Sequence, residues 1–376
     1  MTAEAHAFLS ASSSDRWLHC PPSAKLCAQA EDKGSTYAQE GTDAHAVCEF
    51  LLNEALHRQA EDPREHLIFY DAEMQEVAEG YRDFVMEQVE ESKEQCADPM
   101  VCVEQRLDFS KWVEQGFGTG DCVIVTDGLL HIIDFKYGTG VLVSATDNPQ
   151  LKCYALGALD NFGDLYEMNH VRLSIYQPRR ENISSFELSK EELLKWADEV
   201  LAPTARLAYD GKGEFSVGSH CHFCKVKPTC RKYAEYVLEL ARFEFVDPAL
   251  LSPEDIAAIL PMVEPLMAWG TEVKEYANQQ ALCGIHFPGY KLVEGRSNRK
   301  YSDEAEVAKV VSSAGYDPYD KRLLGITAMQ KLLGKKKFDE LLSGLIMKPQ
   351  GKPVLVPESD ARPEFNTAQN DFYEGD

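Results

Sequence analysis

The sequence predicts a mixed α/β fold in which helices cover a central sheet. Three observations support this prediction. Residues 117–140 carry the pattern of a β-hairpin, residues 101–109 and 170–180 alternate between apolar and polar side chains, and helical patterns lie between these segments. Strands and helices that follow one another in this order are typical of a sheet flanked by helices.

The N-terminal region predicts a short interrupted helix. A serine or aspartate in residues 10–15 can cap a helix that Pro21-Pro22 then interrupts, and Cys20 lies at that break. By itself Cys20 is either a small buried apolar residue or a ligand.

A longer helix begins near Gly41, with Thr42 or Asp43 as the expected N-cap. His45 falls in its first turn, where a histidine is more often a partly exposed polar residue than a ligand. A second amphipathic helix is expected over residues 72–94. Glu104 lies in the strand that follows, where the simplest expectation is a side chain facing solvent.

The hairpin sequence fixes a register. Asp127-Gly128 lies between two apolar runs, and this dipeptide favours a two-residue type I′ turn. Pairing Thr126 with Leu129 places Val123 opposite Ile132 and Asp121 opposite Asp134.

That register brings charged groups together, because Lys136 joins the face of Asp134 by the two-residue strand period. Like charges placed opposite each other destabilise a sheet, and a hard divalent cation held by carboxylate oxygens would offset their repulsion. The alternative is an ordinary hairpin whose aspartates point into water.

A helix is expected after the hairpin, with Pro149 at its first position and Asn148 or Asp147 as its cap. Gln150 and Tyr154 are four residues apart and share one face of it. A tyrosine in such a position more often packs against its neighbours than takes part in function. Residues 189–211 predict another amphipathic helix, which begins with a Ser189–Glu192 capping box.

The most specific local pattern is C-x2-C-x5-C, formed by Cys221, Cys224 and Cys230. Three thiolates at this spacing need a fourth ligand to hold either tetrahedral zinc or a 4Fe-4S cluster. Cys20 is the best distant candidate, and the competitors are His220, His222, Cys27 and Cys283. A set of free thiols is the less favoured alternative.

Composition bounds the class of protein. The net charge of −24 argues against a generic basic coat for nucleic acid, so any DNA contact must be local and metal-assisted. Eleven cysteines, an odd number, fit reduced thiols with one metal or cluster site. We find no stretch close to the ~18 apolar residues of a membrane span, which predicts a soluble, cytoplasmic protein without a membrane partner.

The chain is long enough for two domains or one large one. We expect a first domain over residues 1–245, a mainly helical C-terminal domain over residues 246–356 with a helix break near Pro261, and an acidic, disordered tail over residues 357–376.

Four short motifs together resemble the RecB-type nuclease domain of the PD-(D/E)XK superfamily. They are G-x3-H ending at His45, Asp121 after G-T-G, D-x-K from Asp134 to Lys136, and Q-x3-Y from Gln150 to Tyr154. One cysteine upstream and three downstream resemble the iron–sulfur branch, which includes CRISPR adaptation nucleases, AddB-type nuclease domains and phage-encoded exonucleases. The resemblance covers about residues 8–233.

The chain departs from the family pattern in two places. Gly120 precedes Asp121 where the signature has a proline, and Asp134 stands where many relatives carry glutamate. No G-x4-G-K-[ST] motif is present, so the sequence does not predict a fused ATP-driven motor.

The resemblance implies a central sheet of the restriction-endonuclease-like type and a Mg²⁺- or Mn²⁺-dependent DNA exonuclease. His45, Asp121, Asp134 and the Phe135 carbonyl would hold the metal, Lys136 would act on the water or the transition state, and Gln150 and Tyr154 would orient DNA. Glu104 would act from the second shell. Cys20, Cys221, Cys224 and Cys230 would bind the cluster, with zinc as the alternative.

By the same resemblance, the protein would work in phage or bacterial recombination or DNA end processing. Its partners would be DNA and a single-strand annealing or recombination protein. Two other classes of function stay open at this point. One is a DNA-binding or scaffold module with an idle hydrolytic site, and the other is a redox or zinc protein unrelated to nucleic acid.

Overall fold

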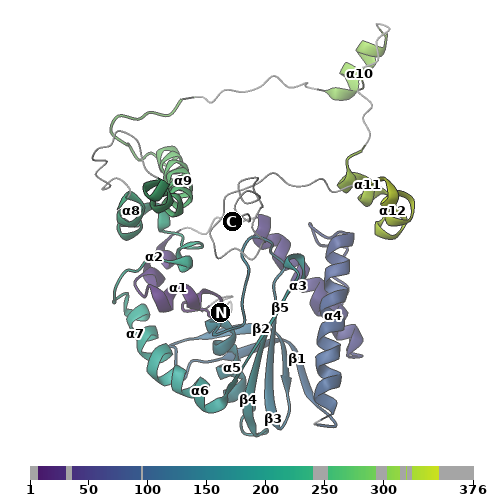
Figure 1. Cartoon of the computed structure of the whole chain (residues 1–376), viewed down its shortest axis with the longest axis vertical. Helices are drawn as coiled ribbons and strands as arrows, with labels where there is room; N and C mark the ends of the chain where they lie inside the picture. The colour runs from purple at the N-terminus through teal and green to yellow at the C-terminus, as the bar shows by residue number, and fades with distance from the viewer. Residues whose placement is uncertain are drawn as a thin grey trace, which may run out of the picture. The chain divides into compact units, whose positions relative to one another are not determined.

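The computed structural model of the protein describes residues 7–30, 36–94, 96–239, 253–293, 303–313, 319 and 324–346 (Figure 1). The chain divides into two units, Met1–Gly295 and Arg296–Asp376. The predicted domain boundary near residue 245 and the predicted tail from residue 357 both lie outside the described residues.

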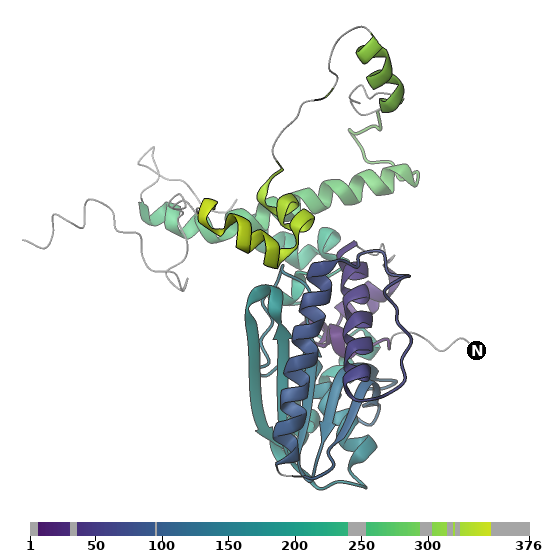
Figure 2. The ribbon, with the colours of Figure 1, turned by 90° about the vertical axis from the view of Figure 1, so that its right-hand side faces the viewer.

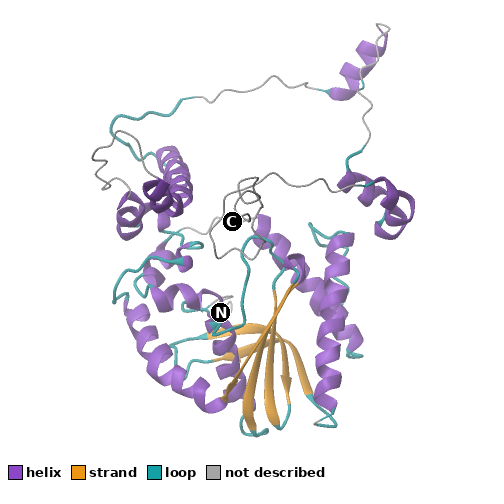
Figure 3. Cartoon of the chain, in the orientation of Figure 1, coloured by secondary structure: helices purple, strands orange, loops and turns teal. Residues whose placement is uncertain are grey.

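Within the described part of the first unit, five strands form one sheet whose spatial order follows the chain (Figure 3). The β3–β4 pair is parallel and the other neighbouring pairs are antiparallel, so the predicted mixed α/β fold is confirmed. Helix α5 (Pro149–Phe162) makes the crossover that parallel neighbours require. The strands are β1 (Met100–Asp108), β2 (Phe117–Val125), β3 (Gly128–Phe135), β4 (Met168–Gln177) and β5 (Asn182–Ser189).

Helices cover both faces of the sheet. Helices α3 (Thr36–Ala55) and α4 (Ala72–Lys93) lie side by side over one face (Figure 2). There Val47 and Val85 pack with Ile124 and Phe135. On the other face, α5 packs against Val123, Ile132 and their neighbours. Alternate side chains of β2 and β3 supply both cores, as the two-residue strand period requires.

The predicted hairpin register is confirmed. Val123 pairs with Ile132, Val125 pairs with Leu130, and the Thr126 N–H donates to the Leu129 carbonyl at 3.0 Å. The predicted type I′ turn is wrong, because such a turn needs positive φ at both central residues and only Gly128 has it, at +94°. Asp127 instead accepts a hydrogen bond from the Glu167 N–H, so a tertiary contact shapes the turn.

The predicted N-cap of the long helix is also wrong. Helix α3 begins at Thr36, so Thr42 and Asp43 lie inside it. Asp43 is buried and accepts the N–H groups of Ile68 and Phe69, which are far from it in sequence. The Asp43 carboxylate therefore accepts hydrogen bonds from the backbone of a loop that folds back onto α3, and not from the first turn of the helix.

Three predicted helix starts are confirmed, whereas no serine or aspartate side chain caps the first N-terminal helix. Helix α4 begins beside Asp71, and the Asn148 side chain caps α5, which has Pro149 at its start. The Ser189–Glu192 capping box opens α6 (Lys190–Trp196). That helix continues through a π-helical turn, η3 (Ala197–Leu201), into α7 (Ala202–Asp210).

The N-terminal segment forms η1 (Ala11–Ser13), α1 (Ser14–His19) and α2 (Ser23–Gln29), with the predicted break at Cys20. A short 3-10 turn, η2 (Pro178–Arg180), follows β4. After α7 come η4 (Ser219–Cys221), η5 (Lys227–Thr229) and α8 (Arg231–Val237). We call residues 216–237 the cysteine module.

Helix α9 (Pro253–Leu282) differs from prediction. It runs through Pro261 and Pro265 without the expected break. By length and composition alone it could also cross a membrane, contrary to our expectation that no such segment exists. Glu272 of this helix forms an ion pair with Lys227, and Leu266 and Trp269 pack against the cysteine module, so α9 has contacts with the rest of its unit.

The described part of the second unit is helical, as predicted. It contains α10 (Glu304–Ser313), α11 (Ile326–Leu333), α12 (Lys335–Leu342) and the short turn η7 (Ser343–Leu345).

Candidate active site and cysteine centre

Three side chains from three elements gather at the middle of β2. His45 Nδ1 of α3 lies 3.3 Å from Asp121 Oδ1 and 3.9 Å from Glu104 Oε1. The ligand atoms of His45, Glu104 and Asp121 all lie within 4.8 Å of one another, and no other described histidines, cysteines and acids form such a group of three. One nitrogen and two carboxylate oxygens are a donor set that divalent cations accept.

Glu104 reaches this group through an unusual backbone conformation. It lies across from Asp121 in β1, between the pairs Val103–Cys122 and Gln105–Gly120, but its φ is +48°. A non-glycine residue with positive φ is strained and often marks a functional site. Its strand position predicted a side chain facing solvent, and the family resemblance implied a second-shell role. Neither predicted its place beside His45 and Asp121, because no local sequence signal predicts this dihedral.

Asp121 is fixed by a backbone group of the neighbouring strand. The β2–β3 ladder ends at the pair Cys122–Ile133, and Asp121 Oδ2 accepts the Phe135 N–H at 2.6 Å. The side chain thus continues the pairing where the backbone ladder stops. This leaves Oδ1 to face His45.

Asp134 near the end of β3 and Lys136 just after that strand extend the site. Lys136 Nζ lies 2.9 Å from Asp134 Oδ2 and also donates to Gln150 Oε1 at 3.3 Å. The Gln150 amide nitrogen lies 3.1 Å from both Asp134 Oδ1 and the Tyr154 hydroxyl. The structure therefore brings the predicted Asp134, Lys136, Gln150 and Tyr154 into one connected chain of contacts.

The Asp134 carboxylate has unused acceptor capacity. It is 2% exposed, and apart from the ion pair with Lys136 its Oδ2 has no aligned hydrogen bond from any described residue. A buried acceptor without a hydrogen bond is costly, and a cation bound at that oxygen would remove the cost. Of the predicted metal ligands, His45 and Asp121 lie with Glu104 in a group that fits a divalent ion, whereas Asp134 does not belong to that group and borders it through Lys136.

The charges at the site act on one another. Burial alone would lower the pKa of His45, but the Asp121 carboxylate and the contact with Glu104 outweigh it and raise that pKa to about 10. Burial acts to raise the pKa of Asp121, and the charges of His45 and Lys136 with the Phe135 N–H overcome it, so the pKa of Asp121 is lowered.

Burial and neighbouring charges also shift the pKa values of Asp134, Glu104 and Lys136. Burial raises the pKa of Asp134 against the attraction of Lys136, and burial also raises the pKa of Glu104. Burial works to lower the pKa of Lys136, but Asp134 and Asp121 outweigh it and raise that pKa. Lys136 is therefore a firmly charged ammonium group.

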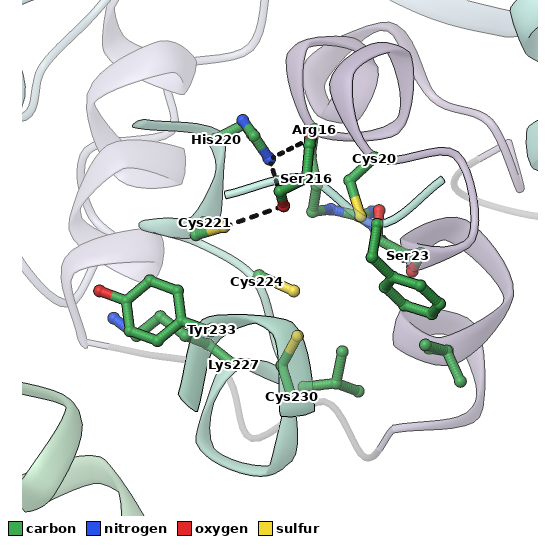
Figure 4. A pocket seen from close by; sticks show the side chains of 13 residues that line it. Arg16, Cys20, Ser23, Ser216, His220, Cys221, Cys224, Lys227, Cys230 and Tyr233 are labelled. Atoms are coloured by element: carbon green, nitrogen blue, oxygen red, sulfur yellow. Dashed lines mark hydrogen bonds between the residues drawn. The ribbon is translucent and has the colours of Figure 1, made fainter. Parts of the chain in front are cut away.

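The predicted cysteine ligands line one cavity. Cys20, Cys221, Cys224 and Cys230 all border it, and Figure 4 shows the sulfurs of Cys20, Cys224 and Cys230 directed into the space between them. These cysteines come from the break between α1 and α2 and from the cysteine module. A fifth thiol, Cys27, lies with its Sγ 3.8 Å from that of Cys224 but does not line the cavity.

The other competing ligands lie elsewhere or are otherwise engaged. Cys283 is exposed just after α9, and His222 is exposed with its ring against Phe223. His220 borders the cavity, but its Nε2 lies 3.2 Å from the Ser216 carbonyl and its ring stacks on His19. The four predicted cysteines therefore line one cavity, and Cys27, whose pKa the contact with Cys224 lowers to about 6, lies beside them.

The comparisons with known proteins identify a family. A model described as protein of unknown function (DUF2800) matches residues 6–363. Among solved structures, the chain is similar to one described as "Crystal structure of SSO0001", with 14% sequence identity and a TM-score of 0.22 over 50% of this chain and 95% of that chain. A TM-score this low carries no argument about fold or function.

Binding of a divalent cation at His45 should release a proton. The raised pKa of His45, about 10, keeps the imidazole charged at about pH 8, whereas only its neutral form binds a metal. Mn²⁺ should therefore bind more tightly as the pH rises toward that pKa. Calorimetry in buffers of different ionisation enthalpy measures the protons released per ion, and His45→Asn should lower that number by about one. An unchanged release in this variant would contradict the assignment of His45 as a ligand.

Proposed function

The chain belongs to the DUF2800 family, and we propose that it is a Mg²⁺- or Mn²⁺-dependent deoxyribonuclease. It would act as an exonuclease in recombination or DNA end processing, on a sheet of the restriction-endonuclease-like type. The observation that carries the proposal is the group of His45, Glu104 and Asp121 beside the ion pair of Asp134 and Lys136. A cation held by these ligands could activate water and stabilise charge on the phosphate, and a fixed positive charge nearby could assist.

The ligand set comes from His45, Asp121, Asp134 and Glu104, with the Phe135 carbonyl as a further oxygen. A divalent ion bound there supplies Lewis acidity toward the phosphate and lowers the pKa of water. The protein contributes by fixing its ligands before the substrate arrives. The hydrogen bond from the Phe135 N–H holds Asp121, and the pairing of β1 with β2 holds Glu104.

Lys136 serves as a source of positive charge rather than as a base. Its raised pKa keeps it protonated at neutral pH, so it can stabilise negative charge that develops on the phosphate. Asp134 and Gln150 hold the ammonium group in place. The resemblance to RecB-type nucleases allows Lys136 to act either on the attacking water or on the transition state. The carboxylates around Lys136 favour the second role, because they keep the lysine charged.

Gln150 and Tyr154 have different roles. Tyr154 is 5% exposed and contacts the Gln150 amide, so it positions Gln150 rather than touching DNA itself. A close approach of Gly118 to the Tyr154 ring leaves no room for a Cβ at that position, which fixes the ring against β2. Gln150 is the more accessible of the two and is the group that we expect to orient the substrate.

The cysteine cavity would hold a 4Fe-4S cluster through Cys20, Cys221, Cys224 and Cys230. Tetrahedral zinc needs thiolates at roughly 2.3 Å from one ion, which brings their sulfurs close together. The cluster is preferred to zinc because the order of the cysteines, one upstream and three downstream, resembles the iron–sulfur branch of the RecB-type nucleases. Its role would be structural, because it ties the N-terminal segment to the segment after α7.

The alternative is a DNA-binding or scaffold module without hydrolytic activity. In either protein Lys136 would offset the charge of the buried Asp134, so the feature that favours the enzyme is the group of cation ligands formed by His45, Glu104 and Asp121 beside that ion pair. The complete set of site residues argues for the enzyme.

With Mg²⁺ or Mn²⁺, the purified protein should degrade end-labelled linear DNA and leave closed circular DNA intact. Asp134→Ala and Lys136→Ala should each lower the rate at least about a hundredfold, since loss of one preorganised charge typically costs this much. Asp160→Ala, at the exposed far end of α5, is the matched control and should retain the rate. Equal rates for the wild type and both site variants would overturn the nuclease, and cleavage of circles would overturn the exonuclease.

Anaerobically purified protein should be brown and contain iron. Cys20→Ser should lose the iron and the visible absorbance, whereas Cys27→Ser should keep both, because Cys27 contacts Cys224 without lining the cavity. Metal analysis of the two variants measures this. Stoichiometric zinc in place of iron, or loss of the metal from Cys27→Ser alone, would refute the assignment.

A further inference from the structure

Two cysteines from distant parts of the chain are in contact beside the cysteine cavity. Sγ of Cys27 in α2 lies 3.8 Å from Sγ of Cys224 in the cysteine module, although the two residues are 197 positions apart. Among the described cysteines, this is the pair whose sulfurs are hydrogen-bonded to each other. A disulfide bond is about 2.05 Å long, so side-chain rotations that bring these sulfurs closer can join them.

Contacts that do not involve the thiols hold the two segments together. The Lys25 ammonium group of α2 donates to the Asp210 carbonyl at 3.0 Å, and the Ser216 hydroxyl of the module donates to the His19 carbonyl at 2.6 Å. Helix α2 also packs against α7, which precedes the module. These contacts keep Cys27 near the module without help from the sulfur atoms.

The two thiols differ in their access to small molecules. Cys224 is partly exposed, and Figure 4 shows its sulfur directed into the cavity. Cys27 is 5% exposed and does not line the cavity. An oxidant that enters the cavity therefore meets Cys224 first, and Cys27 lies beside it as the second thiol. Proteins use this arrangement to convert a reversible thiol oxidation into a disulfide.

Cys27 has no role in the proposed function. The proposed cluster uses the four cysteines that line the cavity, which leaves Cys27 as a buried thiol in contact with one of the ligands. A buried thiol is usually a small apolar residue that packs in a core. The contact between its sulfur and that of Cys224 gives Cys27 a chemical partner instead.

We propose that Cys27 and Cys224 form a modification site, at which hydrogen peroxide converts the two thiols into a disulfide. The disulfide protects Cys224 from irreversible oxidation to sulfinic acid, and reduction by a thiol restores both residues. This inference goes beyond the proposed function and is independent of nuclease activity. It concerns the cluster only because Cys224 is one of the proposed ligands.

The reaction has two steps, and each is balanced. The Cys224 thiolate attacks one oxygen of hydrogen peroxide, the O–O bond breaks, and hydroxide leaves while Cys224 becomes a sulfenic acid. The Cys27 thiolate then attacks the Cys224 sulfur, so the S–S bond forms as the S–O bond breaks and a second hydroxide leaves. The two thiol protons convert both hydroxides to water. Two electrons pass from the sulfurs to peroxide.

A non-reducing gel measures the cross-link in the full-length wild-type chain. The protein is treated with hydrogen peroxide and a chelator, the remaining thiols are blocked with iodoacetamide, and the chain is denatured. A bond between residues 197 positions apart closes a long loop, so the oxidised chain should migrate faster. Dithiothreitol should return it to its original position. Cys27→Ser should lose the faster species.

Peptide mapping by mass spectrometry identifies the joined cysteines. Trypsin separates Cys27 from Cys20 at Lys25, whereas Cys221 and Cys224 stay on one peptide, so fragment ions must assign the second sulfur. The expected product joins residues 26–33 to residues 213–225 through Cys224. In Cys27→Ser, the Cys224 sulfur should instead carry the two oxygens of sulfinic acid, which dithiothreitol does not remove.

Two controls separate this chemistry from loss of the fold. Cys283→Ser removes an exposed thiol just after α9 and should cross-link like the wild type. The thermal unfolding midpoint of reduced Cys27→Ser should match that of the reduced wild type. Cys27→Ala takes its place if the buried position does not tolerate a hydroxyl.

Absence of the Cys27–Cys224 peptide from the oxidised wild type would overturn the proposal. Equal amounts of sulfinic acid at Cys224 in the wild type and in Cys27→Ser would do so too, as would a disulfide between two cysteines of the cavity in place of the expected one. Iron content and nuclease activity are scored separately. A chain that forms the disulfide but never binds iron would contradict the cluster and leave this site standing, and an iron-loaded nuclease without the disulfide would do the reverse.

Discussion

Compensation of buried charge is the constraint on which the site depends. Asp121 and Asp134 are only 8% and 2% exposed, and a buried carboxylate is strongly destabilising unless other groups neutralise it. In the metal-free protein, His45 and Lys136 supply two positive charges against these aspartates and Glu104. Once His45 is neutral, a divalent ion and Lys136 balance all three carboxylates. The same arrangement that is costly when empty is therefore well suited to hold a cation.

The charged groups of the site lie where the regular strand geometry is interrupted. The β2–β3 ladder stops one pair before Asp121 and Asp134 would join it, and the Asp121 side chain takes the Phe135 N–H instead. Glu104 leaves the extended conformation at the corresponding point of β1. The candidate centre and the cysteine cavity then share the N-terminal segment. Residues 11–13 pack against β2 and α5, and Cys20 lies one short helix further on.

Sequence reasoning predicted what local chemistry determines. A two-residue strand period and a short turn around Gly128 were enough to predict the hairpin register, and Pro149 with its asparagine cap placed Gln150 and Tyr154 on one face. Sequence reasoning failed where the role of a residue depends on tertiary contacts or on an unusual backbone conformation. The role of Asp43 depends on the backbone of Ile68 and Phe69, and the position of Glu104 depends on a strained dihedral. No local pattern contains either fact.

The central claim is that a divalent ion binds where His45, Glu104 and Asp121 converge beside Asp134. Anomalous diffraction from crystals of the full chain soaked in Mn²⁺ tests it most directly. The account predicts one strong peak within bonding distance of His45 and Asp121, lost in crystals of Asp121→Asn. A Mn²⁺ peak bound elsewhere on the chain, with none between these side chains, would contradict it.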